Sequence, residues 1–374
     1  MPGLFIRRHA LSVIEYFDVS TLSVHLNCKK NATIFEKEIF TEPKLFEVKI
    51  YTRPANTGIP LFDSFLNISR FFQAHIIGFR EIKHHCGNPD LVHVNVLTRC
   101  GIVALCYKFF KGVPYVITEH WTRYLPGMGN FKGLLRKTLT RIVVNHASAV
   151  LPVTLNLQVS MEKHGLRNSY YCVIPNVVDT NLFKPAAQPV DQTPKIILHV
   201  SCFEDKQKNI SGILRVLEKL ALNRQDWKCI MVGDGIHFNK LVEYASQLHL
   251  KDKFVFFTGL RENNELVELM RLASFQVLFS RFENLPVVIP ESFSCGVPFL
   301  STNVGGISEH LHESLGMLIP SEDEDALLNS IEQMLDHPER YNKDQIRRYA
   351  IDNFSQKVIG EQLRNVYRRV LTST

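Results

Sequence analysis

Residues 275–298, FQVLFSRFENLPVVIPESFSCGVP, carry the clearest structural signal in the chain. The apolar run Phe275–Phe279 predicts a buried strand, and the polar loop Ser280–Leu285 follows it. Pro286 suits the first turn of a helix, and Gly296 is placed to end that helix. This succession is typical of a parallel α/β sheet, in which loops at the carboxyl ends of the strands hold the ligand.

The same alternation of short apolar runs and amphipathic stretches extends in both directions along the chain, which indicates βαβ units. The expected strands are 21–26, 46–52, 91–95, 114–118, 149–153, 171–174, 195–200, 228–232, 254–258, 275–279, 298–302 and 317–319. A proline-rich linker, 183–194, divides them into two sets. We predict two facing doubly wound domains, 1–188 and 189–352, with 353–374 as a C-terminal helix that packs back on the first domain.

The first domain begins unusually. Residues 4–17 have the pattern of a helix, whereas a doubly wound sheet normally opens with a strand that becomes central. The first strand is therefore expected to be missing, either because the start of the sequence is truncated or misassigned or because the sheet forms without it.

Composition and charge limit the function classes. With 374 residues, 45% hydrophobic and 21% charged, the chain is globular rather than disordered or collagen-like. Its net charge of +6 is uneven, because eight basic residues between Arg99 and Arg141 face one acidic residue, Glu119. Such a region suits an anionic membrane surface or a phosphate-bearing substrate, and a solvated basic face fits equally well. Residues 131–144 have the pattern of an interfacial helix. No nucleic-acid-binding motif accompanies the charge, so no nucleic-acid partner is expected.

The eight cysteines lie far apart, and the N-terminal residues lack the pattern of a signal peptide. Read together, these features predict reduced thiols and a cytoplasmic protein, with the inner face of the membrane as a further expectation.

Two loops hold the candidate chemistry. Glu283 precedes the helix that follows Phe279 and Glu291 lies inside it, so the two carboxylates can hold two ends of one polyhydroxylated ligand, with backbone N–H groups between them. After the strand 195–200, Lys206 and Lys208 stand beside a helix start, as expected for a diphosphate site, although surface lysines in a polar loop are the simpler alternative. Gly233 lies in a glycine-containing turn that adds to a phosphate-and-sugar cradle.

At this point the chain resembles a family. Glu283 to Glu291 match the E-x7-E motif of retaining glycosyltransferase family 4, the group 1 glycosyltransferases, which have the GT-B fold of two facing Rossmann-like domains. The supporting matches are residues 174–179 with Phe183, 232–235, 295–298, Gly305 and Gly306 with Glu309, and Gly316.

The resemblance implies transfer of a sugar from a nucleoside-diphosphate sugar, with retained configuration and without a metal or other cofactor, to a glycan or lipid-linked acceptor in cell-surface polysaccharide synthesis. It gives Glu283 and His120 to the reacting centre, Glu291 to the nucleotide ribose and Lys208 to the diphosphate. The remaining donor-binding positions that it implies are Asn284, Leu285, Pro286, Val287, Gly233 and Lys206.

One departure from the family and two rival functions stay open. Cys202 stands where the family usually has an arginine, and Lys206 is the candidate to replace that charge. The acidic run 323–325 is interpreted as a helix cap rather than a metal motif. A nucleotide-sugar-binding protein impaired in catalysis is the alternative function, and a Rossmann-type oxidoreductase is disfavoured because no dinucleotide fingerprint is present.

Overall fold

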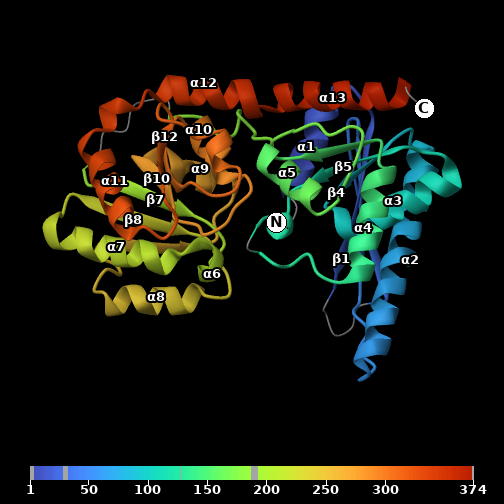
Figure 1. Cartoon of the computed structure of the whole chain (residues 1–374), viewed down its shortest axis with the longest axis horizontal. Coiled ribbons are helices and arrows are strands. Elements are labelled where there is room, and N and C mark those ends of the chain that lie inside the picture. The colour runs from blue at the N-terminus through green and yellow to red at the C-terminus, as the bar shows by residue number, and fades with distance from the viewer. Residues whose placement is uncertain (1–3, 28–32, 127, 187–192, 373–374) are drawn as a thin grey trace.

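The computed structural model describes residues 4–27, 33–126, 128–186 and 193–372. They form an α/β molecule with two halves side by side, blue to green and yellow to red in Figure 1. The expected boundary at 188/189 and the middle of the linker 183–194 lie outside the described residues, as does Cys28. The other seven cysteines are free thiols.

The N-terminal half combines short strands with helices of very different length. Its elements are α1 (Leu4–Val13), β1 (Val19–Leu26), β2 (Phe35–Glu42), β3 (Leu45–Thr52), α2 (Pro60–Cys86), β4 (Val92–Asn95), α3 (Leu97–Lys111), β5 (Tyr115–Glu119), η1 (Thr122–Tyr124), α4 (Leu134–His146), β6 (Ala149–Pro152) and α5 (Leu155–Lys163).

The strands of this half form two three-stranded sheets rather than one. Their orders are β1-β3-β2 and β4-β5-β6, and β1 and β4 are edge strands. A helix is the first described element, as expected. Two strand predictions were wrong. Strand β2, antiparallel to β3, was missed because nearly all its residues are exposed and show no alternation of burial. Residues 171–174 form no strand, only an isolated bridge between Tyr171 and Val150.

The C-terminal half is a six-stranded parallel sheet in the order β12-β11-β10-β7-β8-β9, with helices on both faces (Figure 1). Its elements are β7 (Lys195–Val200), α6 (Asp205–Lys208), α7 (Ile210–Asn223), β8 (Trp227–Val232), α8 (Phe238–Gln247), β9 (Val255–Gly259), α9 (Asn263–Leu272), β10 (Phe275–Leu278), α10 (Val288–Ser294), β11 (Phe299–Thr302), η2 (Ile307–Glu309), β12 (Gly316–Ile319), α11 (Glu324–Asp336), η3 (Pro338–Arg340), α12 (Lys343–Phe354) and α13 (Gln356–Thr372).

Strand β10 shows why the strands of this half could be predicted from the sequence. All four of its residues, the polar Gln276 included, are buried, because a central parallel strand is covered on both faces. Strand β10 pairs with β7 on one side and with β11 on the other. The loops after β7 and β10 therefore leave the sheet at the same edge.

The end of the chain returns to the N-terminal half. Helices α12 and α13 run along the top of Figure 1, and α13 lies over the blue-green half. It packs against α1, and its residues Ile359, Leu363 and Val366 share a buried cluster with Val116 of β5 and Leu151 of β6.

Candidate active site

Lys208 and Glu283 form a buried ion pair between Nζ and Oε1. Lys208 ends α6 in the loop region after β7, and Glu283 lies in the loop after β10, so the neighbouring strands bring the two side chains together. Their residues are only 8% and 5% exposed. Two residues 75 positions apart in the sequence thus form one ion pair at the edge of the sheet.

Burial lowers the pKa of Lys208, but the nearby Glu283 carboxylate and its hydrogen bond outweigh that effect and raise the pKa above its usual range. Lys208 is therefore a cation at neutral pH. A lysine ammonium has three donors, so pairing with Glu283 leaves donors for a further anion.

The position of Glu283 is set by its surroundings. Ser280 donates from Oγ to Oε1 of Glu283 at 2.9 Å, and Gln207 donates from Nε2 to Oε2 at 3.5 Å. Gly305 lies against the Glu283 backbone with φ +61°, and a Cβ there would fall 1.7 Å from the Glu283 carbonyl oxygen. Only glycine fits, since both the contact and the left-handed backbone exclude a side chain.

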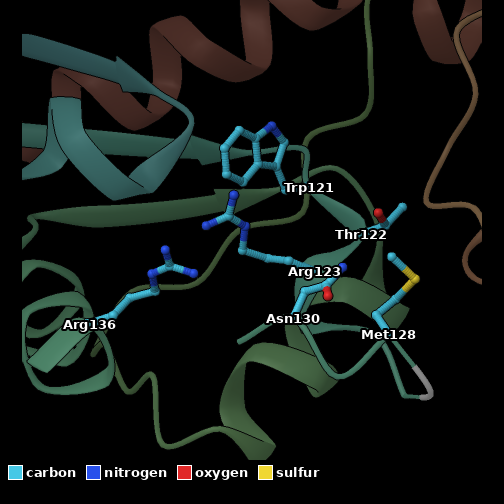
Figure 2. Close-up of a pocket in the computed structure, with 6 residues that line it drawn as sticks. All are labelled: Trp121, Thr122, Arg123, Met128, Asn130 and Arg136. Atoms are coloured by element: carbon cyan, nitrogen blue, oxygen red, sulfur yellow. The ribbon is translucent and has the colours of Figure 1, made fainter. Parts of the chain in front are cut away.

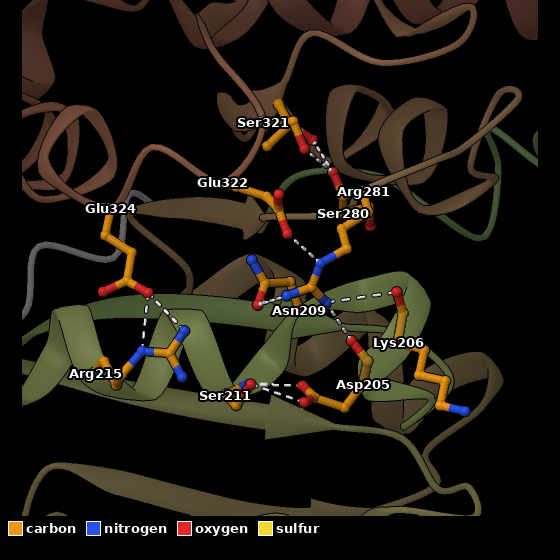
Figure 3. A network of polar contacts seen from close by, with 11 residues as sticks. Asp205, Lys206, Asn209, Ser211, Arg215, Ser280, Arg281, Ser321, Glu322 and Glu324 are labelled. Atoms are coloured by element: carbon orange, nitrogen blue, oxygen red, sulfur yellow. Dashed lines mark hydrogen bonds and ion pairs between the residues drawn. The ribbon is translucent and has the colours of Figure 1, made fainter. Parts of the chain in front are cut away.

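Arg281 links the segment after β7, which carries Lys208, to the loop after β10, which carries Glu283 (Figure 3). Its guanidinium donates from Nη1 to the Asp205 carbonyl at 2.8 Å and from Nη2 to Asn209 Oδ1 at 2.9 Å, and pairs through Nε with Glu322 at 2.6 Å. The exposed Lys206 side chain points away from this guanidinium in the same view. Sequence reasoning missed Arg281, because nothing local distinguishes it from a surface arginine.

Glu291 pairs with a residue of the N-terminal half rather than with Lys208. Its Oε1 accepts from Nη1 of Arg8 at 2.6 Å, and both side chains are buried. Burial raises the pKa of Glu291, and the Arg8 charge opposes that rise. Arg8 also lies 5.2 Å from the centre of the Phe183 ring. This partner, from helix α1, was not found from the sequence.

The helix that holds Glu291 is shorter than expected. Helix α10 begins at Val288, so Pro286, expected in its first turn, precedes it together with Val287, and Glu291 lies in the first turn. Pro286 accepts through its carbonyl from the Ile289 N–H at 3.1 Å, which bends the chain into the helix.

The two halves meet at His120. Asn284 donates from Nδ2 to the His120 carbonyl at 2.7 Å, and Asn176 donates to the Leu285 carbonyl at 2.9 Å while its Oδ1 lies 3.1 Å from His120 Nδ1. Burial moves the pKa of His120 well below its usual value, so the imidazole is neutral. The centre of the His9 ring, from α1, lies 5.7 Å from the centre of the His120 ring. Sequence reasoning also missed His9.

A second contact between the halves involves the motif residue Glu309. Its carboxylate accepts from the N–H groups of Leu155 and Asn156 at 2.7 and 2.8 Å, in the first turn of α5. A carboxylate there also balances the positive end of the helix dipole. Thr154 caps the same helix, and its side chain would clash with a Cβ at Gly306.

Beside the ion pair, a hollow of about 380 Å³ opens at the ends of β7 and β8. Gly233 and Gly235 form one wall, where a Cβ on Gly233 would fall 1.8 Å from the Ser201 carbonyl. Cys202 and Arg261 are on the lining. Arg261 thus supplies a guanidinium on the same hollow as Cys202, from a loop that sequence reasoning did not consider.

Among the described residues, no group of three or more His, Cys, Asp or Glu side chains is arranged to bind a metal ion. The interpretation of the acidic run as a helix cap is confirmed, because Asp323 accepts from the Ala326 N–H at the start of α11.

Comparisons with known proteins place this chain of two α/β halves among the sugar-transferring enzymes of the GT-B class. A model of glycosyltransferase family 4 matches residues 8–182, and a model of glycosyl transferases group 1 matches residues 181–351. The chain belongs to the family 4, group 1 glycosyltransferases.

Individual relatives are distant. An N-acetyl-alpha-D-glucosaminyl L-malate synthase from Bacillus anthracis is 25% identical over 296 residues, which is 76% of each chain. A sucrose-phosphate synthase from Thermosynechococcus elongatus has a TM-score of 0.79 at 19% identity, over 100% of this chain and 94% of its own. Anabaena HepE, in complex with UDP, has a TM-score of 0.68 at 19% identity, over 87% of this chain and 86% of its own. These likenesses establish the GT-B fold.

Proposed function

We propose that this glycosyltransferase takes its sugar from a nucleoside-diphosphate donor, transfers it with retained anomeric configuration and needs no metal ion. The observation that carries the proposal is the buried pair of Lys208 and Glu283 at the edge of the sheet. The departing diphosphate gains negative charge, and a preorganised cation in a partly dry site stabilises that charge without solvent rearrangement. HepE, a neighbour in fold, is described in complex with UDP and glucose, which supports a donor of this type.

In this proposal Lys208 binds the diphosphate and Glu283 contacts the donor sugar. The loop 284–287 lines the site with Asn284 and Leu285 against His120, and the hollow beside Gly233 takes part of the nucleotide. Glu291 holds the ribose through the oxygen that Arg8 leaves open. Two routes give retention: displacement from the same face assisted by the leaving phosphate, and a covalent intermediate on Glu283.

The acceptor is proposed to be a glycan or lipid-linked molecule at a membrane surface. Among the described residues, no helix has both the length and the apolar composition to cross a bilayer. Helix α4 starts with Leu134 and Leu135, 82% and 74% exposed, next to Arg136 and Lys137, a combination that suits an anionic interface. Phe131 is only 4% exposed and does not belong to this face, contrary to the interfacial helix expected over 131–144.

The donor is tested with purified protein and a panel of nucleoside diphosphates and their sugars. We expect one nucleotide family to raise the melting temperature, because a ligand at about 100 times its Kd adds about 2.7 kcal/mol. NMR of the product then reads the anomeric configuration, and chelator-treated protein tests the need for a metal. Binding without turnover toward any acceptor favours the alternative, an impaired nucleotide-sugar-binding protein. Absence of any thermal shift contradicts the proposal.

Membrane contact is tested separately by sedimentation with vesicles rich in anionic lipid. Wild-type protein is expected in the pellet at low salt, and Leu134→Ser with Leu135→Ser is expected to stay in the supernatant. A wild-type chain that remains in the supernatant at low salt contradicts the proposal.

A further inference from the structure

A separate cavity of about 470 Å³ lies in the N-terminal half, lined by Trp121, Thr122, Arg123, Met128, Asn130 and Arg136 (Figure 2). Its size is within the range of small-molecule sites. None of its lining residues belongs to the donor site proposed above, so the cavity is distinct from that site.

The cavity begins one residue beyond the contact between the halves. His120 accepts from Asn284 through its carbonyl, and the next residue, Trp121, is on the cavity wall. Glu119, fully buried at the end of β5, fixes this turn by accepting from the N–H groups of His120 and Trp121 at 2.9 and 2.8 Å. The cavity therefore belongs to the N-terminal half and starts next to the residue that contacts Asn284.

Two guanidinium groups give the cavity its charge. The Cζ of Arg123 lies 3.4 Å from the centre of the Trp121 ring, so the indole fixes the plane of that guanidinium. Arg136, from the first turns of α4, faces the same space in Figure 2. Burial lowers the pKa of Arg123, the nearby Tyr124 and Glu119 oppose that shift, and the Arg136 charge lowers the pKa further.

After the buried Glu119, the sequence around the cavity contains basic residues and no acidic ones. Residues 120–161 contain five Lys or Arg and no Asp or Glu. Planar guanidinium groups bind the two oxygens of a carboxylate or phosphate at once, which a lysine cannot do. Asn130 and Thr122 add an amide and a hydroxyl to the lining. The chemistry of the wall is that of an anion site.

We propose that this cavity receives a carboxylate or phosphate group of the acceptor, bound by Arg123 and Arg136 beneath the Trp121 ring. The inference rests on the proposed function and adds to it the chemical class of the acceptor. The anion is either that of a soluble acid or the phosphate of a lipid, and the test separates the two.

The chain carries its own reporter, since Trp121 is one of only two tryptophans and Trp227 is buried at 1% exposure. Tryptophan fluorescence is titrated with inorganic phosphate, with a soluble hydroxy-acid carboxylate and with a prenyl phosphate in neutral micelles. We expect a saturable change with at least one of these probes. If prenyl phosphate reaches half-saturation at the lowest concentration of the three probes, the acceptor is a lipid. If a soluble probe does so, the acceptor is a soluble acid.

Arg136→Gln is the decisive variant, because Arg136 is exposed and its loss should leave the fold intact. We expect its half-saturation concentration to rise at least about tenfold, equivalent to about 1.4 kcal/mol. Arg136→Lys should recover only part of the affinity. Lys163→Gln is the matched control, because it makes the same change of charge at an exposed residue at the end of α5 outside the cavity lining, and it should shift half-saturation by less than about twofold.

A nucleoside diphosphate titrated into the same variants separates this inference from the proposed function. Normal nucleotide binding without any saturable response to the anions overturns the cavity proposal alone. Equal losses in Arg136→Gln and Lys163→Gln also overturn it, since they would reflect the overall charge of the protein rather than the cavity. Absent nucleotide binding in the wild type counts against the proposed function instead.

Discussion

Arg8 of α1 and Glu291 of α10 form a buried ion pair, 2.6 Å between Nη1 and Oε1, across 283 positions of sequence. The pair ties the first described helix to the second glutamate of the E-x7-E motif. It connects the N-terminal half directly to the proposed donor site, so a change in α1 should affect the motif.

Replacing Arg8 by Met should destabilise the protein by about 3 kcal/mol at neutral pH, because it leaves the Glu291 carboxylate buried without its cation. Burial already raises the pKa of Glu291, and loss of Arg8 raises it further. A folded-state pKa above the unfolded value means that stability falls as pH rises past the unfolded pKa. Urea unfolding should therefore show a larger gap between wild type and Arg8→Met at pH 8 than at pH 5.

The control is Arg8→Met combined with Glu291→Gln. Removal of the carboxylate charge should restore much of the stability at pH 8 and flatten the pH dependence of the gap. A gap of equal size at both pH values would contradict the role given to the ion pair.

Gly305→Ala should cost both stability and turnover, because its Cβ would fall 1.7 Å from the Glu283 carbonyl oxygen and displace the loop that carries that side chain. Gly259→Ala is matched to it, since φ is +70° there but no atom lies within 4 Å of the added Cβ. The control should lose only about 1 kcal/mol from backbone strain and keep its turnover. Similar losses in the two variants would show that the close contact with Glu283 is unimportant.

Acid should unfold this protein through its buried histidines. Burial lowers the pKa of His199 to about 4, and the Val277 carbonyl, which accepts from Nδ1, offsets only part of that shift. The unfolded chain then binds a proton that the folded chain does not, so stability is present above pH 6.5 and is lost as pH falls toward 4, by up to about 3 kcal/mol. Melting temperatures of wild type and His199→Gln across this window should show a shallower fall in the variant. Identical slopes would contradict the assignment.

The sequence predicted the C-terminal half well, because its central strands are buried on both faces and its loops carry motif residues at fixed places. Glu283 and Lys208 were found in that way, and the structure brings them together. Strand β2 was missed because an exposed edge strand has no burial pattern.

Contacts between segments that are distant in the sequence could not be predicted, for a different reason. Arg8 and Arg281 look like surface arginines in the sequence, and only tertiary packing places them against Glu291 and Asp205. The cavity beside Trp121 likewise arises from a loop folding against α4, which no periodicity records.

The central claim is that Lys208 holds a donor diphosphate while Glu283 acts on its sugar. The most direct test is calorimetric titration of the preferred nucleoside diphosphate, with turnover measured on the same samples, for wild type, Lys208→Gln, Glu283→Gln and the control Lys240→Gln on the exposed face of α8. We expect Lys208→Gln to raise Kd at least about tenfold, Glu283→Gln to keep binding but lose turnover by at least about a hundredfold, and Lys240→Gln to match wild type. Wild-type affinity in Lys208→Gln together with wild-type turnover in Glu283→Gln would contradict the claim.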